Sequence, residues 1–298
     1  MHTLTLLLGS LLLMSSASVS MAQTDEKPRV TVTPVKGPLY MLAGRGGNVV
    51  ASVGKDGVLL IDADYSEYAQ AHAAALAELT DSQVAPRFLL NTHWHFDHSG
   101  GNGFWGEQGT VIMAHENIYQ RMSTRQEMKA LGRVVEPSPA AALPVVTYAD
   151  AIAVRFNGDT LQVQHYPSGH TDGDSIVFFT EANVVHMGDH YFAGAFPFVD
   201  LGSGGNVLGY ISNVESALKQ MDEQTIVVPG HGRSLMSKQD VQIDLTALKN
   251  SVSIIAELLQ EGLGPEQIAE RGLGPEYASY GAGFINEAAW ISFVAGSL

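Results

Sequence analysis

The chain has 298 residues, and its 31 Asp and Glu against 16 Lys and Arg give a formal net charge of −15. A protein this acidic repels nucleic acid and anionic lipid, so we expect a small-molecule substrate, no nucleic-acid partner and no stable membrane association. The sequence contains no Cys, which excludes disulfides, zinc thiolates and a cysteine nucleophile. The composition leaves the oligomeric state open.

The first 22 residues have the pattern of a secretory signal peptide. Residues 4–13 form an apolar stretch, and the segment Ser20-Met21-Ala22 offers small residues at the cleavage positions. We therefore expect cleavage near Ala22 and a periplasmic or secreted protein. The remaining residues, 23–298, are numerous enough for one large domain with a substantial core.

The N-terminal half predicts strands followed by helices. Apolar runs separated by Gly-rich turns between Arg29 and Asp62 indicate an antiparallel meander. The next expected elements are a helix at 65–79, a strand at 87–91, a short helix or turn at 101–105, a strand at 110–114 and a charged, amphipathic helix at 116–132. The proline-rich segment 136–144 is either a surface connector or a wall of an active-site cleft.

The C-terminal half repeats this order. The expected elements are strands at 152–156, 161–166, 175–180 and 184–187, a helix at 207–221, a strand at 225–228, a helix at 238–260 and an apolar helix at 284–294. Strands in two groups, each followed by helices, favour two packed sheets with helices outside, which places the chain in the α/β class.

One loop contains His93, His95, Asp97 and His98 in the order His-x-His-x-Asp-His. The apolar run at 87–90 leads into it, as expected for a buried strand that delivers its C-terminal loop to a site. Alternate residues of an extended segment point the same way, so His93 and His95 can share one metal ion. Asp97 and His98 lie beyond the strand end, where they are free to turn toward a second metal ion.

Three isolated residues further along the chain complete this ligand set. Asp189 and His231 each follow an apolar run and a glycine, which is typical of a residue held at a strand end. His170 follows the expected strand at 161–166 through a Pro-Ser-Gly turn, and Gly permits a tight turn that exposes the next side chain. Each residue alone is more typical of a structural role. Together with the loop, they supply ligands for two metal ions.

These residues make the chain resemble the metallo-β-lactamase superfamily, from about Val30 to the C-terminal helix. The histidine-rich loop, the three later residues and the segment Leu59-Leu60-Ile61-Asp62 all match positions of that family. The resemblance implies an αββα four-layer sandwich with the metals at one edge, between the sheets. It also implies that Asp62 steadies the histidine-rich loop from behind.

The resemblance further implies two zinc ions, with iron or manganese as alternatives because carboxylate ligands also suit those metals. The expected ligands, with Asp189 bridging, are His93, His95 and His170 for one ion and Asp97, His98 and His231 for the other. Zinc lowers the pKa of bound water from 15.7 to about 7, which makes hydroxide available at neutral pH. Asp97 is expected to hydrogen-bond this hydroxide as a catalytic residue.

Export and a dinuclear site favour a β-lactamase that opens the lactam ring by attack of metal-bound hydroxide. Typical β-lactamases, however, place Cys or Ser at the position of Asp189, and several carry a Lys three residues on, where this chain has Phe192. The alternatives are a lactone or thioester hydrolase of the glyoxalase II-like branch and a periplasmic redox accessory protein that does not hydrolyse.

Three further residues are weaker candidates for substrate binding. Asn206 lies in a Gly-Asn segment that resembles part of the β-lactamase pocket. Arg45, at a Gly-rich tip, is either an anchor for a substrate carboxylate or a solvated turn residue. His190, beside Asp189, either reaches the substrate or supports the ligands.

Overall fold

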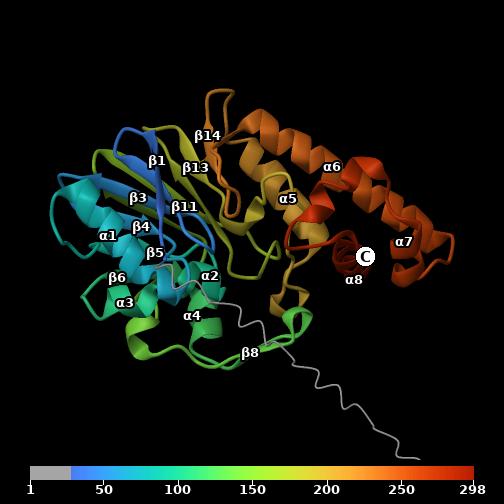
Figure 1. Ribbon diagram of the computed structural model, residues 1–298, viewed down its shortest axis with the longest axis horizontal. Helices are drawn as coiled ribbons and strands as arrows, with labels where there is room; N and C mark the ends of the chain where they lie inside the picture. The colour runs from blue at the N-terminus through green and yellow to red at the C-terminus, as the bar shows by residue number, and fades with distance from the viewer. Residues whose placement is uncertain (1–27) are drawn as a thin grey trace, which may run out of the picture.

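Two β-sheets face each other at the centre of the molecule, and helices cover both outer faces (Figure 1). The computed structural model describes residues 28–298, so the expected signal peptide lies outside the described residues. The first sheet has seven strands in the order β1-β2-β3-β4-β5-β6-β9. These are β1 Thr31–Lys36, β2 Leu39–Ala43, β3 Val49–Gly54, β4 Gly57–Ile61, β5 Phe88–Leu90, β6 Val111–His115 and β9 Val146–Tyr148.

The second sheet has six strands in the order β10-β11-β12-β13-β14-β15. These are β10 Ala151–Phe156, β11 Asp159–His165, β12 Ser175–Phe179, β13 Val184–His186, β14 Ile226–Val228 and β15 Met236–Ser237. Each sheet contains parallel neighbours, β4-β5-β6-β9 in the first and β13-β14 in the second. Parallel neighbours bring the carboxyl ends of strands distant in sequence to one edge, which is where the functional loops of such sheets gather.

The helices belong to two groups. The first-sheet group is α1 Ala69–Thr80, α2 Phe96–Ser99, α3 Asn102–Gly106 and α4 Glu116–Met122. The second-sheet group is α5 Val207–Leu218, α6 Lys238–Gln260, α7 Pro265–Arg271 and α8 Glu287–Ser297. None of the described helices is long and apolar enough to cross a membrane.

Strand β4 shows why the layers form. Its side chains Leu59 and Ile61 pack in the core between the two sheets, whereas Leu60 packs in the outer core that includes Leu76 of α1. Because successive residues of a strand point to opposite faces, a strand that is apolar at every position is buried on both sides. A third core lies between the second sheet and helices α5, α6 and α8. The expected αββα sandwich is therefore confirmed.

Side-chain caps determine where helices α6 and α8 begin. Helix α6 begins at Lys238, because Ser237 and Asp240 form a capping box in which each side chain accepts a hydrogen bond from the backbone N–H of the other residue. The apolar C-terminal helix begins at Glu287, three residues later than expected, because Asn286 accepts a hydrogen bond from the N–H of Ala289.

The expected helix at 116–132 is wrong over its second half. Helix α4 ends at Met122, whose carbonyl accepts a hydrogen bond from the N–H of Ser138. A two-stranded hairpin follows, β7 Gln126–Met128 and β8 Arg133–Val135. Its turn contains Gly132 at a φ of 58°, a left-handed conformation that favours glycine and breaks a helix. The hairpin projects from the sandwich at the carboxyl edge of the sheets (Figure 1).

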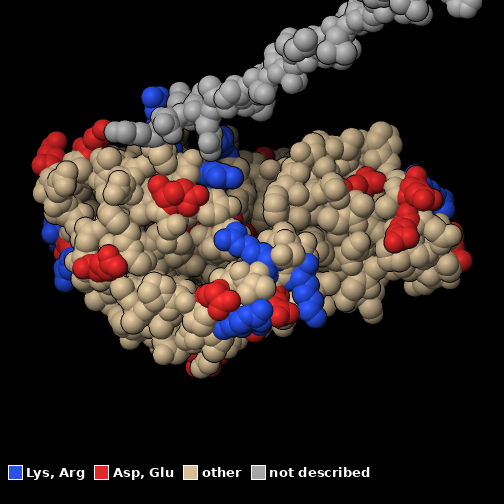
Figure 2. All heavy atoms as spheres, turned by 60° about the horizontal axis from the view of Figure 1, so that its bottom comes forward, with Lys and Arg blue, Asp and Glu red and all other residues tan. Residues whose placement is uncertain are grey.

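Cationic side chains are unevenly distributed on the face that carries this edge. Figure 2 shows Lys and Arg gathered mainly near the middle of the face, with acidic side chains scattered around them.

Candidate metal centre

The histidine-rich loop leaves β5 at the carboxyl edge of the first sheet and is fixed from behind by Asp62. The carboxylate of Asp62 accepts hydrogen bonds from the N–H and the hydroxyl of Thr92, each at 2.7 Å, and lies 2.7 Å from Nδ1 of His98. Asp62 is fully buried at the end of β4. Its negative charge therefore orients the loop and turns Nε2 of His98 toward the edge of the sheets.

A first group of four side chains converges at this edge, namely His93, His95, His170 and Asp189. Nε2 of His170 lies 2.8 Å from Nδ1 of His95. Oδ2 of Asp189 lies 3.7 Å from Nε2 of His93 and 3.4 Å from Nε2 of His170. All four side chains are buried, so the group is shielded from bulk water.

A second group surrounds the other oxygen of Asp189. Oδ1 of Asp189 lies 3.0 Å from Nε2 of His98 and 3.4 Å from Nε2 of His231. Oδ2 of Asp97 lies 3.4 Å from Nε2 of His231 and 4.0 Å from Nε2 of His98. Asp189 thus turns one oxygen to each group. The structure brings together all seven residues that the sequence proposes as ligands.

The donor atoms fit a pair of metal ions. Nε2 of His93 and Oδ1 of Asp189 are buried without a hydrogen-bond partner among the described residues. Leaving buried polar atoms unpaired costs about 1–3 kcal/mol each. Oδ1 of Asp189 is unpaired although Nε2 of His98 lies 3.0 Å away, so the two atoms converge on a common point rather than on each other. Imidazole and carboxylate donors suit zinc, iron and manganese.

The pKa values of the ligands are consistent with cation binding. Burial lowers the pKa of His170 to about 4 and that of His93 well below its usual value, so both imidazoles are neutral, as metal binding requires. Burial would also lower the pKa of His231, but the carboxylates of Asp189 and Asp97 raise it to about 9. The same carboxylates would attract a metal ion in place of that proton.

Two contacts with residues outside the ligand set orient the first group. One of these residues, Asp200, was not predicted from the sequence. Nδ1 of His170 donates a hydrogen bond to the carbonyl of Phe198 at 2.7 Å, and Nε2 of His95 lies 3.1 Å from Oδ2 of Asp200. Asp200 also accepts a hydrogen bond from the hydroxyl of Ser203. Its only signal in the sequence is an acid next to an apolar run, which is too common to single it out.

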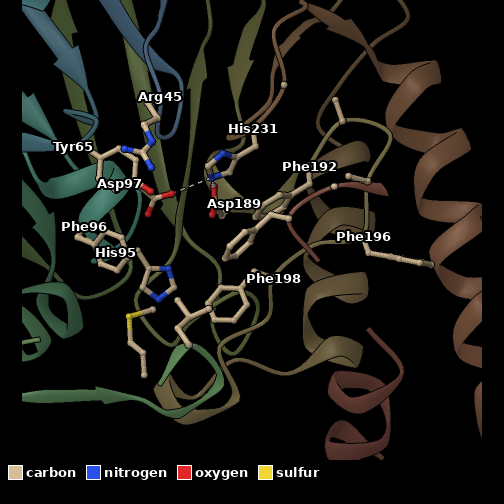
Figure 3. A pocket seen from close by; sticks show the side chains of 17 residues that line it. Arg45, Tyr65, His95, Phe96, Asp97, Asp189, Phe192, Phe196, Phe198 and His231 are labelled. Atoms are coloured by element: carbon tan, nitrogen blue, oxygen red, sulfur yellow. Dashed lines mark ion pairs between the residues drawn. The ribbon is translucent and has the colours of Figure 1, made fainter. Parts of the chain in front are cut away.

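A cleft of about 390 Å³ opens above the two groups. Figure 3 shows Arg45, Tyr65 and Asp97 on one side and Phe192 and Phe198 on the other. Arg45 therefore lines the cleft, which favours the first of its two interpretations. The proline-rich segment 136–144 does not contribute to the lining. Its place is taken by Met128 and Leu131 of the β7–β8 hairpin.

Two of the expected substrate contacts are not observed. Asn206 is the N-cap of α5, where its side-chain oxygen accepts from the N–H groups of Leu208 and Gly209, and it does not line the cleft. A Gly-Asn pair before a helix is therefore a capping signal here. His190 is buried behind Asp189, its Nε2 lies 3.1 Å from Nδ2 of Asn213, and burial lowers its pKa to about 3.

The comparison with protein families agrees with this arrangement of ligands. The model of the metallo-beta-lactamase superfamily matches residues 42–231, a span that contains every ligand of the two groups. The chain therefore belongs to the metallo-β-lactamase superfamily, whose members are metal-dependent hydrolases.

Individual relatives are distant. The atrochrysone carboxyl ACP thioesterase of Aspergillus fumigatus is 25% identical over 247 residues, which cover 80% of this chain but only 50% of the relative, so the chain spans half the length of that enzyme. The hydroxyacylglutathione hydrolase of Erythrobacter litoralis is 29% identical over 107 residues, or 35% of this chain and 34% of the relative.

Solved structures show the same fold. A metallo-beta-lactamase from Pontibacter korlensis superposes with a TM-score of 0.61 at 17% identity, covering 74% of this chain and 100% of the other. The DIM-1 metallo-beta-lactamase superposes with a TM-score of 0.60 at 16% identity, covering 76% and 100%. At these identities the likeness concerns the fold and not the substrate.

Proposed function

We propose that this protein is a dinuclear zinc hydrolase that cleaves activated acyl compounds, with thioesters as the first substrate class. The observation that carries the proposal is the placement of Asp189, whose two oxygens face two separate groups of histidines. A buried carboxylate in this position is suited to bridging two cations. Iron or manganese would fit the same donors.

When bound, the two ions supply an activated water nucleophile and polarise the carbonyl of the substrate. The side chains of the protein position the reactants. Asp97 is the one carboxylate of the second group that lies on the open side of the cleft, where Figure 3 shows it facing the cavity. Burial would raise its pKa, but His231 and His98 lower it to about 2, so Asp97 is ionised at neutral pH and can accept a proton from the attacking water.

The lining of the cleft supports thioesters over β-lactams. Two positions matter for binding a β-lactam. They are position 192, where several β-lactamases carry a Lys, and the Gly-Asn segment, which resembles part of the β-lactamase pocket. Phe192 lines the cleft and stacks on His231, with ring centroids 4.8 Å apart, and Asn206 is occupied as a helix cap. Two of the curated relatives are named as an ACP thioesterase and as a hydroxyacylglutathione hydrolase.

Opening of a β-lactam ring remains the second candidate. It is supported by the expected export and by Arg45, whose guanidinium lies beside the cleft and can pair with a substrate carboxylate. Lactone hydrolysis needs the same carbonyl chemistry and belongs to the same test.

The test is a hydrolysis panel on zinc-loaded protein with a phenylacetyl thioester, a glutathione thioester, a homoserine lactone and a chromogenic cephalosporin. We expect chelator-sensitive cleavage, fastest for a thioester, and loss of most activity in Asp189→Asn, because a neutral amide bridges two cations poorly. If the cephalosporin is cleaved much faster than either thioester, the second candidate takes the place of the first. If a metal-loaded protein cleaves none of the four, the hydrolytic function is wrong and a non-hydrolytic role replaces it.

A further inference from the structure

The cleft has one continuous apolar wall. Phe192 stacks on His231, and the ring of Phe198 lies 5.7 Å from that of His95, so the wall begins at the metal ligands. It continues to Phe284, whose ring centroid is 6.3 Å from that of Phe198 and which is 73% exposed. A large exposed aromatic residue at the mouth of a cleft is typical of a binding surface.

The opposite wall is aromatic and cationic. The guanidinium of Arg45 lies 5.7 Å from the ring centroid of Tyr65, and the rings of Tyr65 and Phe96 are 5.8 Å apart. The guanidinium of Arg133, on β8, lies 3.7 Å above the ring of Phe96. These four residues form a row of alternating contacts that begins at the cleft with Arg45, Tyr65 and Phe96 and ends beside it at Arg133, and we call it the arginine row. Contact with the ring faces holds both guanidinium groups in place.

The arginine row also borders a second hollow beside the cleft. This hollow, of about 340 Å³, is lined by both arginines, and it shares Arg45, Tyr65 and Phe96 with the cleft. Its one acid is Glu67, whose carboxylate is 4.0 Å from Arg45 in an exposed and therefore weak pair. Within residues 28–298, Arg133 has no carboxylate partner within 4.0 Å.

This local excess of positive charge contrasts with the protein as a whole. The net charge is −15, yet Figure 2 shows Lys and Arg gathered near the middle of this face, with acidic side chains beside them. A negatively charged protein repels anions except where a local field favours them. The arginine row provides such a field next to the apolar wall.

We propose that the cleft selects substrates that combine a bulky apolar acyl group with an oxyanion on the leaving group. The apolar group would lie along Phe192, Phe198 and Phe284, and the carboxylate, sulfonate or phosphate would bind at Arg45 and Arg133. The scissile carbonyl then lies between them, above Asp189. The position of the scissile carbonyl rests on the proposed hydrolytic function, whereas the preference for apolar compounds that carry an oxyanion does not.

A matched pair of fluorescent probes tests the binding preference without any turnover. The sulfonated probe 8-anilinonaphthalene-1-sulfonate and the neutral N-phenyl-1-naphthylamine share one aromatic frame and differ in the anion. In the double variant Arg45→Gln/Arg133→Gln, we expect the Kd of the sulfonate to rise about tenfold and that of the neutral probe to change less than about twofold. The control is Arg155→Gln/Lys219→Gln, which removes two exposed cations that line neither hollow.

A second variant tests the apolar wall. Phe284→Ser should weaken both probes about threefold, because both lose the same apolar contact. Val145→Ser is the matched control, since Val145 is 71% exposed and does not line the cleft. If the arginine double variant binds the sulfonate as tightly as its control does, or if Phe284→Ser leaves both probes unaffected, the proposal is overturned.

A hydrolysis assay distinguishes a failure of this inference from a failure of the proposed function. The substrates are the phenylacetyl thioester of 3-mercaptopropionate and that of its methyl ester, which differ in the charge of the carboxyl group and by one methyl group. We expect the wild type to prefer the anionic thioester about tenfold in kcat/KM, mainly through KM, and the arginine double variant to lose that preference. Charge-dependent probe binding without hydrolysis would contradict the proposed function but not this inference. Hydrolysis of both thioesters at equal rates would contradict this inference alone.

Discussion

Oδ2 of Asp200 lies 3.1 Å from Nε2 of His95, although the two residues are 105 positions apart in the chain. The other ring nitrogen of His95, Nδ1, lies 2.8 Å from Nε2 of His170 inside the first ligand group. A carboxylate beside Nε2 holds the proton there and leaves the lone pair of Nδ1 free for a metal ion. Asp200 therefore sets both the orientation and the tautomer of His95.

Replacement of Asp200 by alanine should weaken metal binding at the first group without removing a ligand. We expect a loss of about 10- to 100-fold in affinity, as for outer partners of metal-bound histidines in general. Competition titration with a chromogenic chelator measures it. Asp222→Ala is the control, because it removes an exposed acid that belongs to neither ligand group and does not line the cleft. Equal metal affinity in Asp200→Ala and the control would show that His95 needs no such support.

Substitution of single ligands should separate the two groups. His95→Ala is expected to lose the metal ion of the first group, since His95 is a candidate ligand in that group alone, and Asp97→Ala to lose that of the second. Elemental analysis after gentle dialysis should find about one ion per chain in each variant and about two in the wild type. Retention of two ions in the double variant would contradict the ligand assignment.

His190 should make the stability of the fold depend on pH in the acid range. Burial lowers its pKa to about 3 in the folded chain, against about 6.5 in the unfolded chain. Above pH 6.5 the residue is neutral in both states and has no effect. As the pH falls from 6.5 toward 3, only the unfolded chain takes up the proton, so the free energy of unfolding falls by up to about 1.4 kcal/mol per pH unit.

The variant His190→Gln removes this titration and retains an acceptor for Asn213. As the pH falls from 7 to 4.5, the wild type should therefore lose more stability than the variant, as measured by urea unfolding. The ligand histidines titrate in both proteins, so their contributions cancel in the difference. A constant difference over this range would mean that His190 takes up its proton at the same pH in the folded and the unfolded chain.

Export was predicted from residues that the structure does not describe, and it remains a prediction. We expect the mature chain to begin near residue 23, because small residues follow the apolar stretch. N-terminal sequencing of the protein recovered from a periplasmic extract checks this. A chain that retains Met1 in that extract would not have been processed.

The ligand set was predictable because its chemistry is local in the sequence. His93 to His98 lie within one loop, and each later ligand follows a strand or a Gly-containing turn. Parallel neighbours such as β4-β5 and β13-β14 carry these positions to the same edge, so local signals were sufficient. Asp200 was not predictable in this way, since its role depends on a contact across 105 residues.

The remaining errors arise where one pattern fits two structures. Segment 116–132 is charged with apolar residues at intervals, which suits a helix. Its first half does form α4, but the second half enters the β7–β8 hairpin that lines the cleft. Tertiary contacts decided against the helix, because the carbonyl of Met122 bonds the N–H of Ser138. Asn206 shows the same ambiguity, because a helix cap and a substrate contact both call for an amide.

The most direct test of the central claim is a zinc titration of metal-free protein, with bound zinc and thioester hydrolysis measured on the same samples. Because Asp189 turns one oxygen to each histidine group, we expect hydrolysis to rise with bound zinc and to reach its maximum at about two ions per chain. Full hydrolytic activity in protein free of any metal, or two bound zinc ions with no cleavage of any acyl substrate, would contradict the account.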